Sequence, residues 1–267
     1  MDVVIEIGGR LGNVLFQLAQ GYEYAKNANA DNIYVYPTSE WWFENYKTYS
    51  DLHFFPIFNG SFDNFITLRE HIYMWPTFFP LIYNQNVRLG GCFESEDFHP
   101  KDLFMLDYIS KIQEKVEKEI IKKYDGINDS VGISIRRGDY MTTSGFIIPD
   151  EKWYLDMYHK YFDGRNVLVF SDDIEWCKSV FKNETNFRYQ ENVWNEDHTI
   201  ITNALDNLYL MATCRDHICS CSTYSWWGCK LFEKDGAVNI FHTPRFNNGR
   251  WELNYIPSRW IKEPCNV

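Results

Sequence analysis

The 267-residue sequence has no apolar run near the ~20 residues that a membrane-spanning helix requires. The best candidate, residues 75–83, is interrupted by Pro76 and Pro80. Glycine and proline are scarce, at 15 and 9 residues, which excludes collagen-like and low-complexity classes. Met1 leads directly into a strand-like segment, so no secretory signal is expected. We therefore expect a soluble, cytoplasmic protein with at most peripheral membrane association.

Positive charge is also in short supply. Lysine and arginine number 26 against 37 aspartates and glutamates, which gives a formal net charge of −11. Nucleic acids and anionic lipids require a basic face, so we expect neither as a partner. An anionic small ligand needs only two or three well-placed arginines and backbone N–H groups, so this class of ligand is retained.

The cysteines do not form a disulfide framework by number, because there are only seven in a chain of this length. An odd number leaves at least one thiol unpaired, which favours a reducing compartment. Aromatic residues, by contrast, are abundant: 10 Trp, 18 Tyr and 20 Phe make 18% of the chain. Most must fill the core, but tyrosine and tryptophan also suit the walls of a binding cleft.

Hydrophobic periodicity predicts two α/β halves. The first opens with a strand over residues 2–7, a glycine loop, an amphipathic helix and a strand over 32–37. Residues 40–106 are irregular and aromatic apart from a short strand near 87–89, and a connector helix is predicted over 107–124. The second half alternates strands with helices of about ten residues, which is typical of a parallel, doubly wound sheet. We predict domains 1–125, including the connector helix, and 126–267.

Two motifs follow predicted strands and carry groups suited to an anion. The loop GGRLGN over residues 8–13 combines glycines with Arg10, but it lacks the dinucleotide-binding glycine spacing. It can equally be a tight turn with Asn13 as helix N-cap. Arg136 and Arg137 end the strand over 131–135, where a diphosphate would satisfy both guanidinium groups. The alternative is a salt bridge from this pair to Asp139 and other carboxylates.

Two further motifs lie at later strand ends. Asp172 and Asp173 follow the strand over 167–170 and could accept from a ribose or a base, or cap the next helix. The segment CSTYSWW over 221–227 places hydroxyl groups at a helix N-terminus, which is a ready anion site, or a simple capping sequence. No Walker A loop, nucleophile elbow or HExxH sequence is present, and we expect no metal or other cofactor.

Together these motifs resemble those of the α-1,2-fucosyltransferases of glycosyltransferase family 11. Six family patterns have counterparts here. They are GGRLGNQLFQYA at residues 8–19, GYFQS at 91–95, HVRRGDY at 134–140, FSDD followed by Trp at 170–173 with Trp176, DxLxLM at 206–211 and NSTFSWW at 221–227. The resemblance runs in order along nearly the whole chain. It implies a GT-B fold, an α/β architecture in which two Rossmann-like domains with parallel sheets face a central cleft. It also implies inverting transfer of L-fucose from GDP-β-L-fucose to a sugar hydroxyl, in α-1,2 linkage to a galactose-like hexose.

The same resemblance implies residue roles. We assign catalysis to Arg136, Asp139 and Asn13. We assign donor binding to Gly9, Arg10, Ser134, Arg137, Asp172, Asp173, Ser222, Thr223 and Ser225. We assign acceptor contacts to Glu94, Trp41 and Trp42. Arg136 would contact the leaving diphosphate, and Asp139 and Glu94 are the candidates for the general base.

Three departures from the family patterns define the alternatives. Ser134 replaces histidine, Cys221 replaces asparagine and Glu94 replaces glutamine. These changes keep open a catalytically silent relative that binds a glycan or nucleotide. A Rossmann-type oxidoreductase fits less well, because the glycine spacing is imperfect and Asp31 precedes the second strand instead of ending it.

Overall fold

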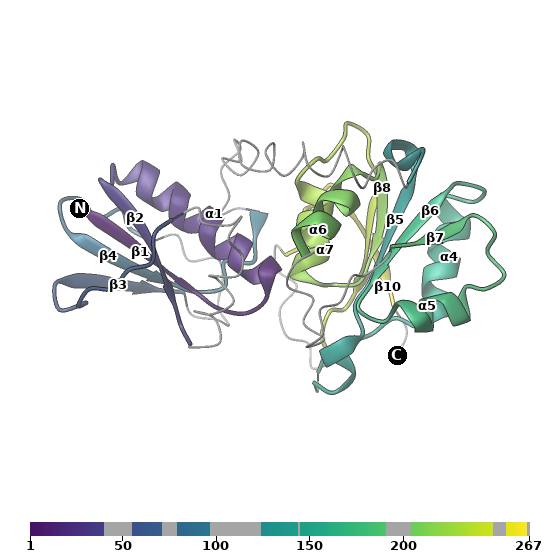
Figure 1. Cartoon of the computed structure of the whole chain (residues 1–267), viewed down its shortest axis with the longest axis horizontal. Coiled ribbons are helices and arrows are strands. Elements are labelled where there is room, and N and C mark those ends of the chain that lie inside the picture. Colours follow the sequence, from purple (N-terminus) through teal and green to yellow (C-terminus); the bar gives the residue numbers. More distant parts are fainter. Residues whose placement is uncertain are drawn as a thin grey trace. The chain divides into compact units, whose positions relative to one another are not determined.

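The computed structural model describes residues 1–39, 55–70, 79–96, 124–143, 145–190, 204–247 and 255–265 (Figure 1). The chain divides into two compact units, Met1–Met105 and Leu106–Val267. Residues 97–123 lie outside the described residues, so the domain boundary at residue 125 and the connector helix over 107–124 stay predictions. Among the described helices, none is long and apolar enough to cross a membrane. All seven cysteines are free thiols, and six of them are buried.

The N-terminal unit is a four-stranded parallel sheet in the order β2-β1-β4-β3 (Figure 1). Its elements are β1 (Asp2–Ile7), α1 (Leu11–Asn27), β2 (Asn32–Pro37), β3 (Phe65–Arg69) and β4 (Asn86–Gly90). The β-loop-α-β opening and the strand near 87–89 are confirmed. The edge strand β3 was missed, because its half-exposed sequence FITLR lacks the continuous apolar run of a buried parallel strand.

Helix α1 lies directly on the sheet because Gly21 has no side chain. A Cβ at Gly21 would come within 2.2 Å of Ile5 Cδ1, so any larger residue would push the helix away from β1. Buried Leu18 and Ala25 extend the same contact with Val3 and Val35. The predicted 3- and 4-residue spacing of apolar residues therefore marks the face of α1 that covers the sheet.

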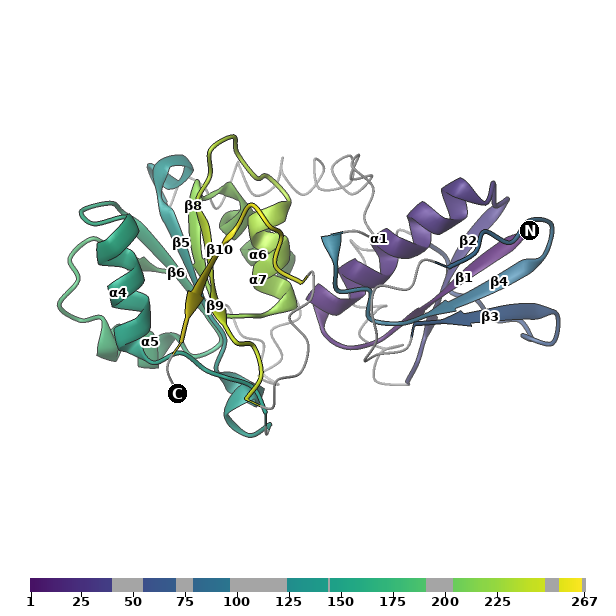
Figure 2. The ribbon, with the colours of Figure 1, turned by 180° about the vertical axis from the view of Figure 1, so that it is seen from behind.

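The C-terminal unit is a six-stranded parallel sheet in the order β10-β9-β8-β5-β6-β7. Its strands are β5 (Val131–Ile135), β6 (Val167–Ser171), β7 (Phe187–Tyr189), β8 (Asp216–Cys219), β9 (Asn239–Thr243) and β10 (Ile261–Pro264). Its helices are α4 (Glu151–Tyr161), α5 (Ile174–Val180), α6 (Ala204–Thr213) and α7 (Thr223–Lys230), with two short 3-10 turns, η4 (Ile127–Asp129) and η5 (Gly138–Met141). Helices α4 and α5 lie on one face and α6 and α7 on the other (Figure 2). Beyond β9 the sequence analysis missed β10, which adds an edge strand beside β9.

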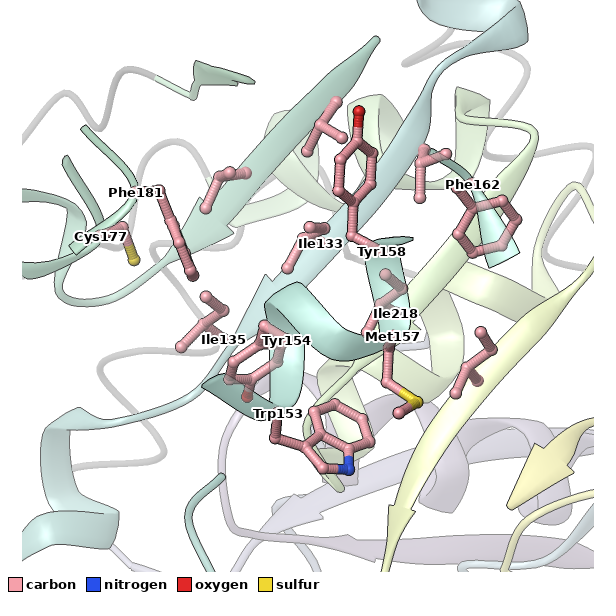
Figure 3. Packing of buried hydrophobic residues seen from close by; sticks show 14 of the residues in the cluster. Ile133, Ile135, Trp153, Tyr154, Met157, Tyr158, Phe162, Cys177, Phe181 and Ile218 are labelled. Atoms are coloured by element: carbon pink, nitrogen blue, oxygen red, sulfur yellow. The ribbon is translucent and has the colours of Figure 1, made fainter. Parts of the chain in front are cut away.

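Strand alternation in β5 separates the core from the polar face. Ile133 and Ile135 pack with Trp153, Tyr154 and other large side chains of α4 in the main core (Figure 3). The intervening residues face α6 and α7, since a Cβ at Gly132 would lie 3.4 Å from Cys214, and the Ser134 Oγ contacts Ser225. This period-2 alternation fixes which side chains reach the sheet's carboxyl edge.

Candidate functional site

The carboxyl edge of the C-terminal sheet gathers two arginines and two aspartates. Arg136 and Arg137 follow β5, while Asp172 and Asp173 follow β6. The register pairs Ile135 with Ser171, so the two dipeptides lie side by side although 36 residues separate them in sequence. The carboxyl ends of parallel strands are the usual ligand-binding edge of such sheets.

Arg136 is held by two carboxylates. Its two terminal nitrogens lie 2.6 Å from Asp172 Oδ2 and 2.5 Å from Asp139 Oδ1. Its backbone N–H donates to Ser220 Oγ at 3.0 Å, which ties the end of β5 to the end of β8. The guanidinium carbon lies 5.6 Å from the Tyr140 ring centroid. These contacts fix the guanidinium plane before any ligand binds.

Arg137 is held in a different way. Its guanidinium stacks over the Trp176 ring, with 3.8 Å between the guanidinium carbon and the ring centroid, and its Nε lies 3.1 Å from Asp173 Oδ2. Its backbone N–H donates to Asp172 Oδ1 at 2.9 Å. Asp173 also caps α5 by accepting from the Trp176 N–H at 3.3 Å. The alternatives of a salt-bridged Asp139 and a capping Asp173 are therefore confirmed as contacts. The acceptance of a hydrogen bond from a ribose or a base by either Asp172 or Asp173 stays a prediction.

Hydroxyl groups line the start of α7 at the same edge. Ser222 is the N-cap and accepts from the Tyr224 N–H at 3.3 Å. Thr223 is the first residue of the helix, and Ser225 is 1% exposed. Ser134 is also buried, with its Oγ 2.8 Å from Ser225 Oγ. The capping alternative for this segment is confirmed, and the helix N-terminus still offers N–H groups that favour an anion.

The glycine loop of the N-terminal unit follows β1. Gly9 has φ +85°, and a Cβ there would lie 2.4 Å from Asn13 Nδ2, so the turn requires glycine. Arg10 is the N-cap of α1, with an exposed side chain, and Asn13 lies in the first turn. The alternative in which Asn13 is the N-cap was wrong, because the helix begins two residues earlier, at Leu11.

Gln17 joins this loop to the loop after β4. Its Oε1 accepts from the Gly8 N–H at 2.9 Å and its Nε2 donates to the Gly91 carbonyl at 3.1 Å. Glu70, which follows β3, accepts at Oε2 from the backbone N–H groups of Cys92 and Phe93, each at 2.8 Å. The ends of β1, β3 and β4 are therefore tied to one another.

The predicted acceptor residues are only partly described. Glu94 lies half-buried in the loop after β4, beside the Phe93 backbone that Glu70 holds. Trp41 and Trp42 lie outside the described residues, so their assignment stays a prediction. In the part of the chain that the structure describes, no group of three His, Cys, Asp or Glu side chains could hold a metal ion.

Sequence reasoning missed four residues that organise these edges. Ser220 and Trp176 orient the two arginines, and Gln17 and Glu70 fix the loops of the N-terminal unit. Ser220 directly follows β8, which is a signal that could have found it. Glu70 directly follows β3, a strand that was itself missed, so no signal in the sequence pointed to it. Gln17 gives no such signal, because its position on the buried face of α1 looks like ordinary packing.

The sequence model of glycosyl transferase family 11 matches residues 89–261, well over half of the chain. The chain belongs to glycosyl transferase family 11. The matched range includes the arginine pair, the aspartate pair and the hydroxyl-rich start of α7. Membership of this family sets aside the oxidoreductase alternative.

Two relatives from Escherichia coli are similar to this family 11 chain. An alpha-1,2-colitosyltransferase is 28% identical over 298 residues, covering 97% of this chain and 98% of the relative. The O-antigen biosynthesis glycosyltransferase WbnK is 32% identical over 112 residues, covering 39% of this chain and 34% of the relative. The first likeness extends over both units.

Among solved structures, the chain is similar to the NodZ alpha-1,6-fucosyltransferase co-crystallized with GDP, a fucosyltransferase from Bradyrhizobium. The TM-score is 0.56 at 13% sequence identity, covering 86% of this chain and 92% of that chain. At this identity the likeness concerns the fold. It confirms the predicted GT-B fold of two α/β units with parallel sheets, and the central cleft between them stays a prediction.

Proposed function

We propose that this protein transfers a 6-deoxy-L-hexose, L-fucose or its 3-deoxy analogue colitose, from its GDP-linked donor to a hydroxyl of a glycan. The transfer inverts the anomeric centre and forms an α-1,2 linkage, with a galactose-like hexose as acceptor. The observation that carries this proposal is the pre-oriented arginine pair at the carboxyl edge of the C-terminal sheet, beside the start of α7.

The arginine pair suits the chemistry of nucleotide-sugar cleavage. As the bond to the diphosphate breaks, negative charge builds on phosphate oxygens and positive charge on the sugar ring. Donors that are already oriented lower this barrier because no reorganisation is needed as the charge develops. We assign this role to Arg136, with Arg137, Ser222 and Thr223 completing the binding of the diphosphate.

The carboxylates around Arg136 leave it able to bind this ligand. Arginine has five N–H donors, and the contacts to Asp139 and Asp172 engage one terminal nitrogen each. The remaining donors can address a diphosphate while the two carboxylates keep the fork in plane. Because Asp139 is already paired with Arg136, it serves better as an orienting group than as a general base.

Two observations bear on which donor sugar, fucose or colitose, the protein uses. The alpha-1,2-colitosyltransferase relative favours the 3-deoxy sugar, while the structure of NodZ soaked with GDP-fucose concerns a protein of the same fold at 12% identity. Ser134 replaces a histidine of the family pattern, and its hydroxyl is buried against Ser225. A smaller, neutral side chain at this position changes the space beside the arginine pair, which is where the two donors would be distinguished.

The test is a transfer assay with the purified full chain. GDP-fucose, GDP-colitose and GDP-mannose are each offered with β-galactosides, and the product linkage is determined by NMR. We expect transfer from GDP-fucose or GDP-colitose, none from GDP-mannose, and an α-1,2 product. GDP binding without transfer from any of the three donors would instead support the catalytically silent relative.

A further inference from the structure

The N-terminal unit carries an anchored carboxylate that the proposed reaction has not used. Glu70 directly follows β3, so it lies at the carboxyl edge of its parallel sheet, the edge where ligands bind in open α/β sheets. Its Oε2 accepts two backbone N–H groups, from Cys92 and Phe93, at 2.8 Å each. For Oε1, no hydrogen-bond partner lies among the residues that the structure describes.

The loop around Glu70 is built to hold it. A Cβ at Gly91 would lie 2.6 Å from the Glu70 Cβ and 2.9 Å from its Oε2, so only glycine lets the loop close over the carboxylate. Phe93 is buried and has φ +53°, a left-handed conformation that is strained for a non-glycine residue. In this conformation the loop directs two N–H groups at one carboxylate oxygen of Glu70.

Three other charged groups near this edge are paired with one another. Glu6 forms ion pairs with Arg69 at 2.7 Å and with Arg88 at 2.5 Å. Glu94, in the loop held by Glu70, is the nearby charge that acts on it. Burial raises the pKa of the Glu70 carboxyl above its ordinary value, the two donated N–H groups partly offset this, and the Glu94 charge raises it further.

We infer that Glu70 is the general base that accepts the proton of the glycan hydroxyl. The inference rests on the proposed function. The hydroxyl O–H transfers its proton to Glu70 Oε1 while the oxygen lone pair forms the bond to the anomeric carbon. The bond from that carbon to the diphosphate oxygen breaks, its electron pair leaves with GDP, and the neutral Glu70 then returns its proton to water. A carboxylate with one oxygen fixed and the other available has the geometry that this step requires.

Glu70→Gln is the decisive variant, because its amide oxygen can still accept from the loop while it can no longer take a proton. We expect kcat to fall 10²- to 10⁴-fold, the usual contribution of a general base. GDP binding should be unchanged. The melting temperature should be unchanged or higher. A raised folded-state pKa means that the ionised carboxylate destabilises the fold above that pKa, and the amide removes this cost.

The pH profile and chemical rescue separate catalysis from positioning. For the native chain, kcat/KM should decrease as pH falls through the raised pKa of Glu70, and this acid limb should be absent in Glu70→Gln. Formate should restore part of the activity of Glu70→Ala, because a small carboxylate can enter the vacated space. The matched control is Asp63→Asn, an exposed carboxylate in the same unit that should leave activity unchanged.

Two results would overturn the inference in an active enzyme. One is near-normal kcat for Glu70→Gln, which would make Glu70 an anchor for the loop only. The other is loss of the acid limb in Glu94→Gln with its retention in Glu70→Gln, which would assign the base to Glu94. Absence of transfer by the native chain from any GDP-sugar would instead contradict the proposed function, so the two failures are distinguishable.

Discussion

The two parallel sheets hold charged side chains at their carboxyl edges in different ways. In the C-terminal unit the edge carries Arg136 and Arg137, and each guanidinium is oriented by carboxylate side chains. In the N-terminal unit it carries Glu70, and this carboxylate is oriented by backbone N–H groups. The same position in the same kind of sheet therefore holds guanidinium groups oriented by side chains in one unit and a carboxylate oriented by backbone groups in the other.

The difference in anchoring has a physical reason. A guanidinium is a multiple donor, so two or three acceptors from different strands can hold it and still leave donors for a ligand. A carboxylate only accepts hydrogen bonds, so a loop with two converging N–H groups can fix one of its oxygens and leave the other oxygen for a ligand. We infer that the C-terminal edge stabilises the charge of a leaving group and the N-terminal edge handles a hydroxyl proton.

Among the variants of the C-terminal unit, the largest effect is expected from Arg136→Lys. Lysine keeps the charge but loses the planar fork that meets Asp139 and Asp172 together. We expect kcat/KM for the donor to fall by about 10²–10³, or ~2.7–4 kcal/mol, the scale for losing one charge-stabilising donor. Steady-state kinetics measure this, with Arg259→Lys as control, since Arg259 pairs with Glu233 away from the arginine pair. Near-normal kinetics in the folded variant would contradict the assignment.

A second effect concerns how the stability of the C-terminal unit depends on pH. His242 is buried in the C-terminal unit, and its burial lowers its pKa from 6.5 to about 4. The unfolded chain then binds more protons than the folded one between these values, so stability decreases as pH falls below about 6.5. From this shift we expect a loss of about 2 kcal/mol between pH 7 and pH 5.

Denaturant unfolding at the two pH values measures this loss. His242→Gln should reduce it. Buried His217, whose pKa is also lowered by burial, should retain a share of the pH dependence. Equal stability of the native chain at pH 7 and pH 5 would show that neither histidine is held neutral by the fold.

A smaller effect tests how the arginines are oriented. Asp172→Asn keeps the shape of the side chain but removes the charge that faces Arg136 at 2.6 Å. We expect kcat/KM to fall about tenfold, ~1.4 kcal/mol, because Asp139 still holds the other nitrogen. Asp173→Asn is the matched variant and should lose less, since Asp173 is more exposed and Arg137 keeps its stack on Trp176. The reverse order would show that Arg137, not Arg136, is the critical cation.

Sequence reasoning reached the fold because both units follow local rules. Buried runs such as β1 and β5, followed by glycine loops and amphipathic helices, predicted parallel sheets. The half-exposed edge strands β3 and β10 escaped because their sequences carry no continuous apolar run. An edge strand gains its structure from one neighbour, and the sequence of that strand alone does not contain this information.

The residues of the candidate site could be predicted from the sequence, but the contacts between their side chains could not. Ser134 faces Ser225 of α7 because strand alternation turns it away from the core. The two dipeptides after β5 and β6 are neighbours because these strands pair. Which aspartate holds which arginine does not follow from the sequence, since it depends on side-chain geometry between residues that lie 3 or 36 positions apart in sequence. Glu70 was missed for the same reason, because its partners are backbone groups of a loop more than twenty residues away.

The smallest effect is expected from removing divalent cations. Enzymes that bind nucleotide diphosphates often use a metal ion to balance the phosphate charge. At the C-terminal edge, two guanidinium groups and the N-terminus of α7 supply positive charge at the place where a metal would act. The acidic side chains nearby, Asp172 and Asp173, are engaged by Arg136 and Arg137 and so compete poorly for a cation.

We expect excess chelator to change kcat/KM by less than about twofold. The assay uses chelator-treated protein and measures transfer before and after addition of magnesium or manganese. Loss of activity that either ion restores would show that the aspartate pair binds a metal and that the arginines alone do not balance the leaving group.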